Sequence, residues 1–111
     1  MVRETASELI QRLGHSVVSC RSGPEALSFF ERNWQRVDLV ILDMIMPEMS
    51  GKETFDAMRA IHCDVRVLLA SGYSMDDEIR QLIENGARAY IQKPFTTQEL
   101  GDRIEEIIRL A

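Results

Sequence analysis

The sequence predicts an α/β domain in which a parallel sheet carries helices on both of its faces. Short apolar runs alternate along the chain with amphipathic segments, and this alternation is typical of repeated strand–helix units. The runs 37–42 and 65–70 are almost entirely apolar, as expected of parallel strands that are covered on both faces. A chain of 111 residues is long enough for one hydrophobic core. We therefore expect a single domain over residues 1–111.

The first part of the chain predicts a helix, a strand and a second helix. Residues 2–13 carry apolar side chains at helical spacing, and Gly14 follows as a suitable helix end. Residues 16–20 are then predicted to form a short strand. Ser22 followed by Pro24 marks the start of the next helix, because proline is favoured in the first helical turn. Its inner face is predicted to contain Ala26, Leu27, Phe30 and Trp34.

Three more strand–helix units follow, with strands predicted at 37–42, 65–70 and 88–92. The helix after the second of these strands ends at 85–86, an Asn-Gly pair, and residues 96–99 form a capping box for the last helix. The apolar faces of the three helices contain Phe55, Met58 and Ile61, then Met75, Ile79, Leu82 and Ile83, then Leu100, Ile104, Ile107 and Ile108.

The composition argues against two classes of partner and indicates a compartment. With 13 basic and 18 acidic residues the net charge is −5, and no basic face is clustered, so we expect no direct nucleic-acid binding. No apolar run approaches the roughly 20 residues that span a membrane, so we expect no membrane partner. Cys20 and Cys63 lie far apart and outside any metal-ligand spacing. They favour two buried free thiols in a reducing compartment, and we expect a cytoplasmic domain.

Polar side chains stand where three of the predicted strands end: Asp43, Ser71 and Lys93. The carboxyl ends of parallel strands meet at one edge of the sheet, where sites form in such folds. A carboxylate, a hydroxyl and an ammonium would therefore converge there. A carboxylate can attack phosphorus, and the transferred phosphoryl group needs fixed cations and hydrogen-bond donors.

Each of these residues also has a plain structural interpretation. An aspartate after a strand is often a turn or helix cap, a serine in this place is more often a cap, and a lysine before proline can be an ordinary surface residue. The three together are harder to explain in this way, because all of them fall at the same end of successive strands.

The residues around these positions resemble the receiver domains of bacterial response regulators in two-component signalling. The segment 43–51 (Asp-Met-Ile-Met-Pro-Glu-Met-Ser-Gly) looks like the phosphorylation loop of that family. The segment 70–72 is similar to its hydroxyl-bearing switch segment, and 86–95 is similar to its closing signature. The resemblance covers the whole chain. It implies a flavodoxin-like doubly wound sheet of five strands in the order 2-1-3-4-5.

The resemblance implies a phosphoacceptor site. Asp43 would take the phosphoryl group from a histidine kinase or its phosphotransfer domain, and Lys93 would pair with that group. Asp43 and the backbone carbonyl of Ile45 would hold Mg²⁺, and a cis peptide bond would join Lys93 to Pro94. Such a domain is a phosphoacceptor switch in a phosphorelay and not an enzyme acting on other substrates.

The resemblance also implies a switch. Ser71 would bond a phosphoryl oxygen after moving inward, and Tyr90 would turn inward with it. Tyr90 is equally well interpreted as a half-buried strand aromatic, since tyrosine is common in strands. The face made by the fourth helix, the last strand and the last helix would then bind a downstream protein or a second receiver.

The sequence departs from the family at its beginning. Receiver domains begin with a hydrophobic strand that ends in an acidic pair, and this pair binds Mg²⁺; here Met1 lies in or next to the first helix. We expect a receiver domain that is N-terminally truncated, lacks its first strand and binds Mg²⁺ weakly. The loss of a central strand removes backbone partners worth about 1–3 kcal/mol each when buried.

Two other functions remain open. The missing acidic pair favours a non-phosphorylated adaptor with the receiver fold, or a domain-swapped interaction module. An aspartate-nucleophile phosphatase of the dehalogenase type would carry a second aspartate two positions after the first. That position is Ile45, which disfavours the phosphatase.

Overall fold

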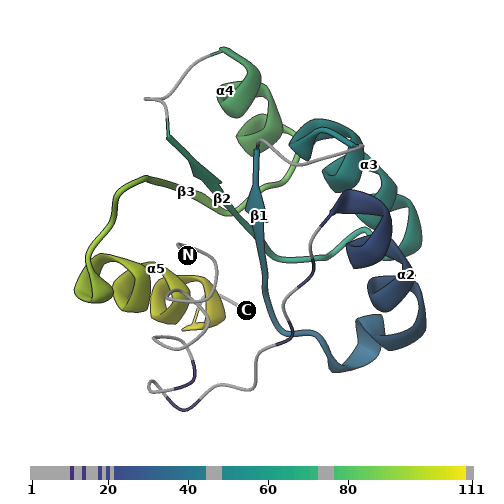
Figure 1. Ribbon diagram of the computed structural model, residues 1–111, viewed down its shortest axis with the longest axis horizontal. Coiled ribbons are helices and arrows are strands. Elements are labelled where there is room, and N and C mark those ends of the chain that lie inside the picture. The colour runs from purple at the N-terminus through teal and green to yellow at the C-terminus, as the bar shows by residue number, and fades with distance from the viewer. Residues whose placement is uncertain are drawn as a thin grey trace.

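The computed structural model describes residues 11, 14, 18, 20, 22–44, 49–72 and 77–109. Within them, three parallel strands form one sheet in the order β1-β2-β3. Helices lie on both faces of this sheet (Figure 1), which confirms the predicted doubly wound α/β fold. The strands are β1 Val40–Asp43, β2 Val67–Ser71 and β3 Ala89–Gln92.

The helices begin where the sequence supplies side-chain caps. Ser22 Oγ accepts the backbone N–H of Glu25 at 3.3 Å before the first described long helix. The predicted capping box before the last helix is confirmed, because Thr96 and Glu99 bond each other's backbone N–H at 3.1 and 3.2 Å. The helices are α2 Gly23–Asn33, η1 Trp34–Arg36 (a 3-10 turn), α3 Gly51–Ile61, α4 Asp77–Glu84 and α5 Thr97–Arg109.

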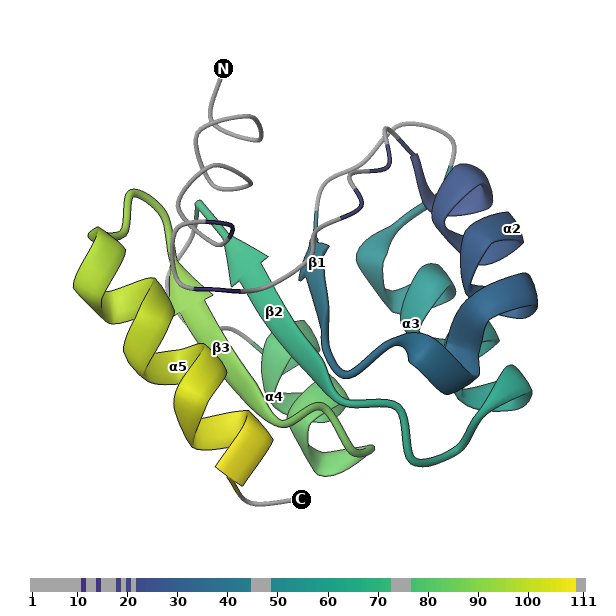
Figure 2. The same ribbon diagram turned by 90° about the horizontal axis from the view of Figure 1, so that it is seen from below.

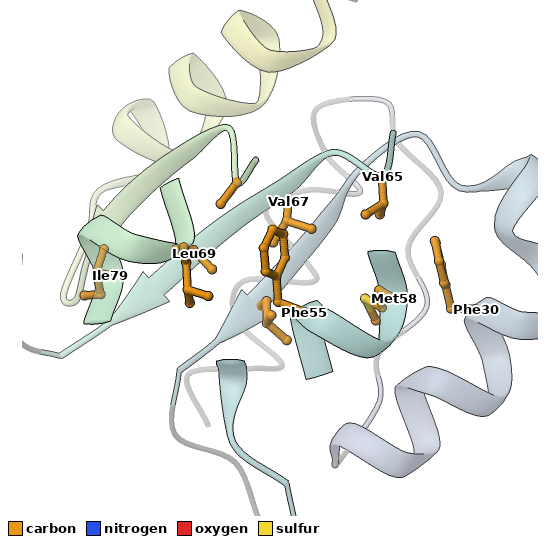
Figure 3. Packing of buried hydrophobic residues seen from close by; sticks show 10 residues of the cluster. Phe30, Phe55, Met58, Val65, Val67, Leu69 and Ile79 are labelled. Carbon is orange, nitrogen blue, oxygen red and sulfur yellow. The ribbon is translucent and has the colours of Figure 1, made fainter. Parts of the chain in front are cut away.

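The sheet divides the core into two clusters, because successive strand residues face opposite sides. Val67 and Leu69 of β2 face α2, α3 and α4, where they pack with Phe55 (Figure 3). Leu68 and Ala70 pack with residues of α5 on the other side. Figure 2 shows α5 on the side of the sheet away from α2 and α3. All five residues of β2 are buried, as predicted for a strand covered on both faces. The other buried members are Phe30, Leu42, Met58, Val65, Ile79, Leu82 and Ala87 in the first cluster, and Ile91, Leu100, Ile104 and Ile107 in the second.

The strands begin later than the apolar runs predicted. Residues 37–39 are not in the sheet, because the 3-10 turn η1 precedes them and the N–H of Val37 bonds the carbonyl of Trp34 at 3.3 Å. Ladder pairing starts only at Val40, whose N–H reaches the carbonyl of Arg66 at 2.9 Å. An apolar run shows which residues are buried, and buried residues extend beyond those that have a ladder partner.

Trp34 was predicted on the inner face of the preceding helix. It lies in the 3-10 turn η1 after that helix and still packs against the first cluster.

Several predictions at the start of the chain are tested at single residues only. In the predicted helix 2–13 only Gln11 is described; it is helical, and the N–H of Gly14 bonds its carbonyl at 3.0 Å. In the predicted strand 16–20 only Val18 and Cys20 are described, and neither is in a strand. β1 is the edge of the described sheet, so the missing first strand stays a prediction. In the described part of the chain no helix is long and apolar enough to cross a membrane.

Candidate functional site

Asp43 is the last residue of β1, at the carboxyl edge of the sheet. It lies opposite Ala70 in the register of β1 with β2. The ladder continues one step further, because the N–H of Met44 donates to the carbonyl of Ala70 at 3.0 Å. The strand thus includes Asp43, which was predicted to follow it, and the aspartate is held on a rigid element.

Lys93 meets Asp43 across the width of the sheet. Its Nζ donates to Oδ2 of Asp43, although the two residues lie 50 positions apart in the sequence. The main chain of Lys93 is anchored as well, since its N–H donates to the carbonyl of Ser71 at 2.7 Å. The Lys93–Pro94 peptide bond is cis, as the family resemblance implies. The structure therefore brings two of the three predicted polar residues into direct contact.

The third polar residue, Ser71, ends β2 and is only 2% exposed. In the register of β2 with β3 it lies opposite Gln92, the residue directly before Lys93. Its backbone carbonyl holds Lys93. Ser71 therefore belongs to the same edge as the ion pair, with its hydroxyl group buried.

Tyr90 lies in β3 opposite Leu69 and is partly buried. Its ring packs against the cluster that α2, α3 and α4 form with the sheet. A half-buried aromatic residue in a strand makes a contact of this kind. Tyr90 also pairs with β2, the strand that ends in Ser71. Ile45, the other residue assigned to the metal, lies outside the described residues.

The start of α3 completes the edge, and the sequence reasoning did not identify it. Ser50 Oγ accepts the N–H of Glu53 at 3.1 Å, and Glu53 Oε1 accepts the N–H of Ser50 at 3.1 Å. The pattern Ser-x-x-Glu before an apolar helical face is a visible signal for this capping box. The N–H of Gly51 then donates to the carbonyl of Met44 at 3.3 Å, which joins α3 to the end of β1.

The side chains at this edge are accessible to a small reactant. Lys93 and Asp43 are 29% and 39% exposed, so the carboxylate is reachable from solvent while one of its oxygens is bound by the ammonium. A carboxylate is a nucleophile toward phosphorus, and an adjacent fixed cation is what a transferred phosphoryl group requires. The arrangement can thus support acyl-phosphate formation.

The described side chains do not by themselves enclose a metal ion. No group of three or more His, Cys, Asp or Glu that could hold a metal occurs among the residues the structure describes. Mg²⁺ is commonly bound through one or two carboxylates together with waters and phosphate oxygens. The carboxylate of Asp43 has the right chemistry for one such ligand, so the residues present fit a weakly held ion.

The parallel sheet with helices on both faces is the flavodoxin-like fold of CheY-like proteins, and the aspartate–lysine pair lies at its carboxyl edge. Residues 1–105 match the family described as the response regulator receiver domain, and the chain belongs to this family. The fold and the family predicted from the sequence are both confirmed.

The relatives of this chain differ greatly in length. Sensor kinase CckA from Brucella abortus is 32% identical over 107 residues, which are 96% of this chain and 11% of the kinase. Sporulation initiation phosphotransferase F from Bacillus subtilis is 30% identical over 109 residues, 98% of this chain and 86% of that protein. A solved receiver domain protein from Clostridium thermocellum has a TM-score of 0.92 at 28% identity, covering 98% of this chain and 86% of that one. This chain therefore spans most of the phosphotransferase but about a tenth of the kinase.

Proposed function

We propose that this receiver domain accepts a phosphoryl group on Asp43 from a histidine kinase or its phosphotransfer domain. The observation that carries the proposal is the contact between the Lys93 ammonium and the Asp43 carboxylate at the open edge of the sheet. The relatives support it, because they are named as a sensor kinase and a phosphotransferase. Receiver domains are signalling switches, and the chain would act in this way rather than as an enzyme on other substrates.

The transfer would use groups at the carboxyl edge of the sheet. An oxygen of the Asp43 carboxylate attacks phosphorus and forms the new O–P bond. The P–N bond of a phosphohistidine, or the P–O bond of a small acyl phosphate, breaks and leaves its electron pair on the departing nitrogen or oxygen. The ammonium of Lys93 moves from the carboxylate toward the incoming phosphoryl oxygens and balances their negative charge.

Mg²⁺ binding is typical of receiver domains, and we propose a weak Mg²⁺ site here. Asp43 and the backbone carbonyl of Ile45 would hold the ion together with waters. When bound, it would neutralise part of the phosphoryl charge. The protein's own residues supply the nucleophile, through Asp43, and a second positive charge, through Lys93.

Ser71 and Tyr90 would convert phosphorylation into a change of surface. A phosphoryl group on Asp43 would attract the Ser71 hydroxyl, and Tyr90 would move inward with the end of β2. A ligand shifts such an equilibrium only through contacts that differ between the two states, and the new bond to Ser71 is such a contact. The face of α4, β3 and α5 would then bind a downstream protein or a second receiver.

Cys20 and Cys63 are not joined in a disulfide, which suits a reducing compartment, and we propose that the exchange takes place in the cytoplasm. The sequence predicted buried thiols, whereas Cys20 is partly buried and Cys63 is exposed. A non-phosphorylated adaptor is the alternative function. An adaptor would keep the fold and bind partners without taking up phosphate.

The test is phosphorylation of this chain by acetyl phosphate with Mg²⁺, followed by intact mass. We expect a gain of one phosphoryl group that disappears in Asp43→Asn. Asp38→Asn serves as the matched control, since Asp38 is an exposed aspartate shortly before β1. Absence of the gain in a folded chain would contradict the proposal and support the adaptor. A gain that persists in Asp43→Asn would place the phosphoryl group elsewhere.

A further inference from the structure

We propose that Gly51 is a positioning residue for the phosphoacceptor, because its lack of a side chain lets α3 start directly against the backbone that follows Asp43. The inference rests on the proposed function and adds a residue to it. It concerns how the Asp43 carboxylate is kept in place, since Gly51 itself has no group that could touch the phosphoryl donor.

The backbone of Met44, the residue after Asp43, is held from two sides. On one side the N–H of Met44 donates to the carbonyl of Ala70 in β2 at 3.0 Å. On the other side the carbonyl of Met44 accepts the N–H of Gly51 at 3.3 Å. Since Met44 directly follows Asp43, these two bonds fix the end of β1 between a neighbouring strand and a helix start.

A side chain at Gly51 has no room on this side. A Cβ built there would lie 2.8 Å from Cα of Met44, 2.9 Å from its Sδ and 3.3 Å from the carbonyl oxygen of Asp43. The sulfur belongs to a flexible side chain and can rotate away. The Cα and the carbonyl oxygen are backbone atoms, so they can move only together with the end of β1.

The helix cannot easily give way instead. The capping box of Ser50 and Glu53 fixes the backbone immediately before Gly51. Thr54, which is fully buried, adds a bond from its Oγ1 to the carbonyl of Ser50 at 2.9 Å. A residue larger than glycine would therefore push the Asp43–Met44 segment away and shift the carboxylate relative to Lys93.

The expected effect is on rate more than on folding. A displacement of about 1 Å at a reacting group can slow a reaction about 100-fold. We expect Gly51→Ala to remain folded and to be phosphorylated by acetyl phosphate about 100-fold more slowly than the unmodified chain. The double variant with Met44→Ala should stay slow, because removal of the sulfur leaves the backbone clash in place.

The control is Ile107→Ala, which opens a cavity under α5 in the cluster on the other face of the sheet. It should lower the urea midpoint at least as far as Gly51→Ala does and keep the wild-type phosphorylation rate. If Gly51→Ala lowers the midpoint but keeps the wild-type rate, the glycine is only structural and the inference is overturned.

A second readout does not depend on phosphorylation. The NMR chemical shift of the Asp43 carboxyl carbon reports its contact with Lys93, so Lys93→Met should change that shift in the unmodified chain. In the Gly51→Ala background the same substitution should change it much less. Equal changes in both backgrounds would overturn the inference. A chain that takes up no phosphate would refute the proposed function alone, and the NMR result would still decide the role of Gly51.

A milder pair of variants covers the case in which Gly51→Ala does not fold. Ser50→Ala removes the cap that holds Gly51, whereas Ser22→Ala removes the corresponding cap of α2. Both lose one N-cap bond, but only Ser50 adjoins the contact with Met44. We expect slower phosphorylation in Ser50→Ala than in Ser22→Ala, and equal rates would count against the positioning role.

Discussion

Replacement of Lys93 by methionine should separate the function of the ion pair from its effect on folding. Methionine keeps most of the apolar length of the side chain and removes the charge. Because the two partners are 29% and 39% exposed, solvent screens their attraction. Pairs of this kind contribute about 0–1 kcal/mol to folding, so the free energy of unfolding of Lys93→Met should change by less than about 1 kcal/mol.

The effect on phosphorylation should be much larger. A fixed donor aimed at developing charge contributes about 100- to 1,000-fold to a rate, which is roughly 2.7–4 kcal/mol of barrier. The structure places the cationic side chain of Lys93 directly on Asp43, so its loss should slow phosphorylation by about that factor. Intact mass measured over time with acetyl phosphate gives the rate, and urea unfolding gives the stability.

The chain offers a matched control, because Lys52 is its only other lysine. Its Nζ bonds Oδ2 of Asp56 at 3.0 Å on α3, and both side chains are 49% exposed. Lys52→Met should leave both the rate and the stability nearly unchanged. The reasoning is refuted if Lys93→Met is phosphorylated at the wild-type rate. It also fails if Lys93→Met slows the reaction no more than Lys52→Met does.

Two further predictions concern stability. Phe55 is fully buried and lies 5.8 Å below the Arg59 guanidinium, so Phe55→Ala should cost about 3–5 kcal/mol of unfolding free energy in urea, and a loss below about 1 kcal/mol would contradict the packing described. Gly86 has φ +124°, and a Cβ there would meet Arg59 no closer than 3.6 Å, so Gly86→Ala should cost about 1–3 kcal/mol from backbone strain alone. Gly72→Ala, where a Cβ meets nothing within 4 Å, should be nearly neutral in the same assay, and equal losses at both glycines would argue against strain.

The helix ends could be predicted well because they depend on residues close to them in the sequence. Ser22, the Asn85-Gly86 pair and the box of Thr96 and Glu99 each act within a few residues of the helix end that they define. Gly86 has a positive φ, a conformation that glycine adopts without strain, and it therefore ends the helix as its sequence predicted. Such signals need no knowledge of the rest of the fold.

The strand bounds could not be predicted as well, because a strand is defined by its partner. The predicted strands 37–42 and 88–92 began at Val37 and Arg88, but neither residue is in the sheet. Arg88 does donate its N–H to the carbonyl of Val67 at 2.9 Å, one residue before β3 begins. Pairing of this kind depends on segments that are distant in the sequence, and hydrophobicity does not record it.

The Asp43–Lys93 pair could be predicted from the sequence, whereas the role of Gly51 could not. The meeting of Asp43 with Lys93 follows from a general rule, since parallel strands bring their carboxyl ends to one edge, and the motif supplies the residue types. The role of Gly51 depends on atoms of Met44 that would lie within 3 Å of a Cβ if residue 51 had one. A sequence shows that a glycine is present but not what its absent Cβ would touch. Residues that react can therefore be predicted from order along the chain, whereas residues that hold them in place require the packed structure.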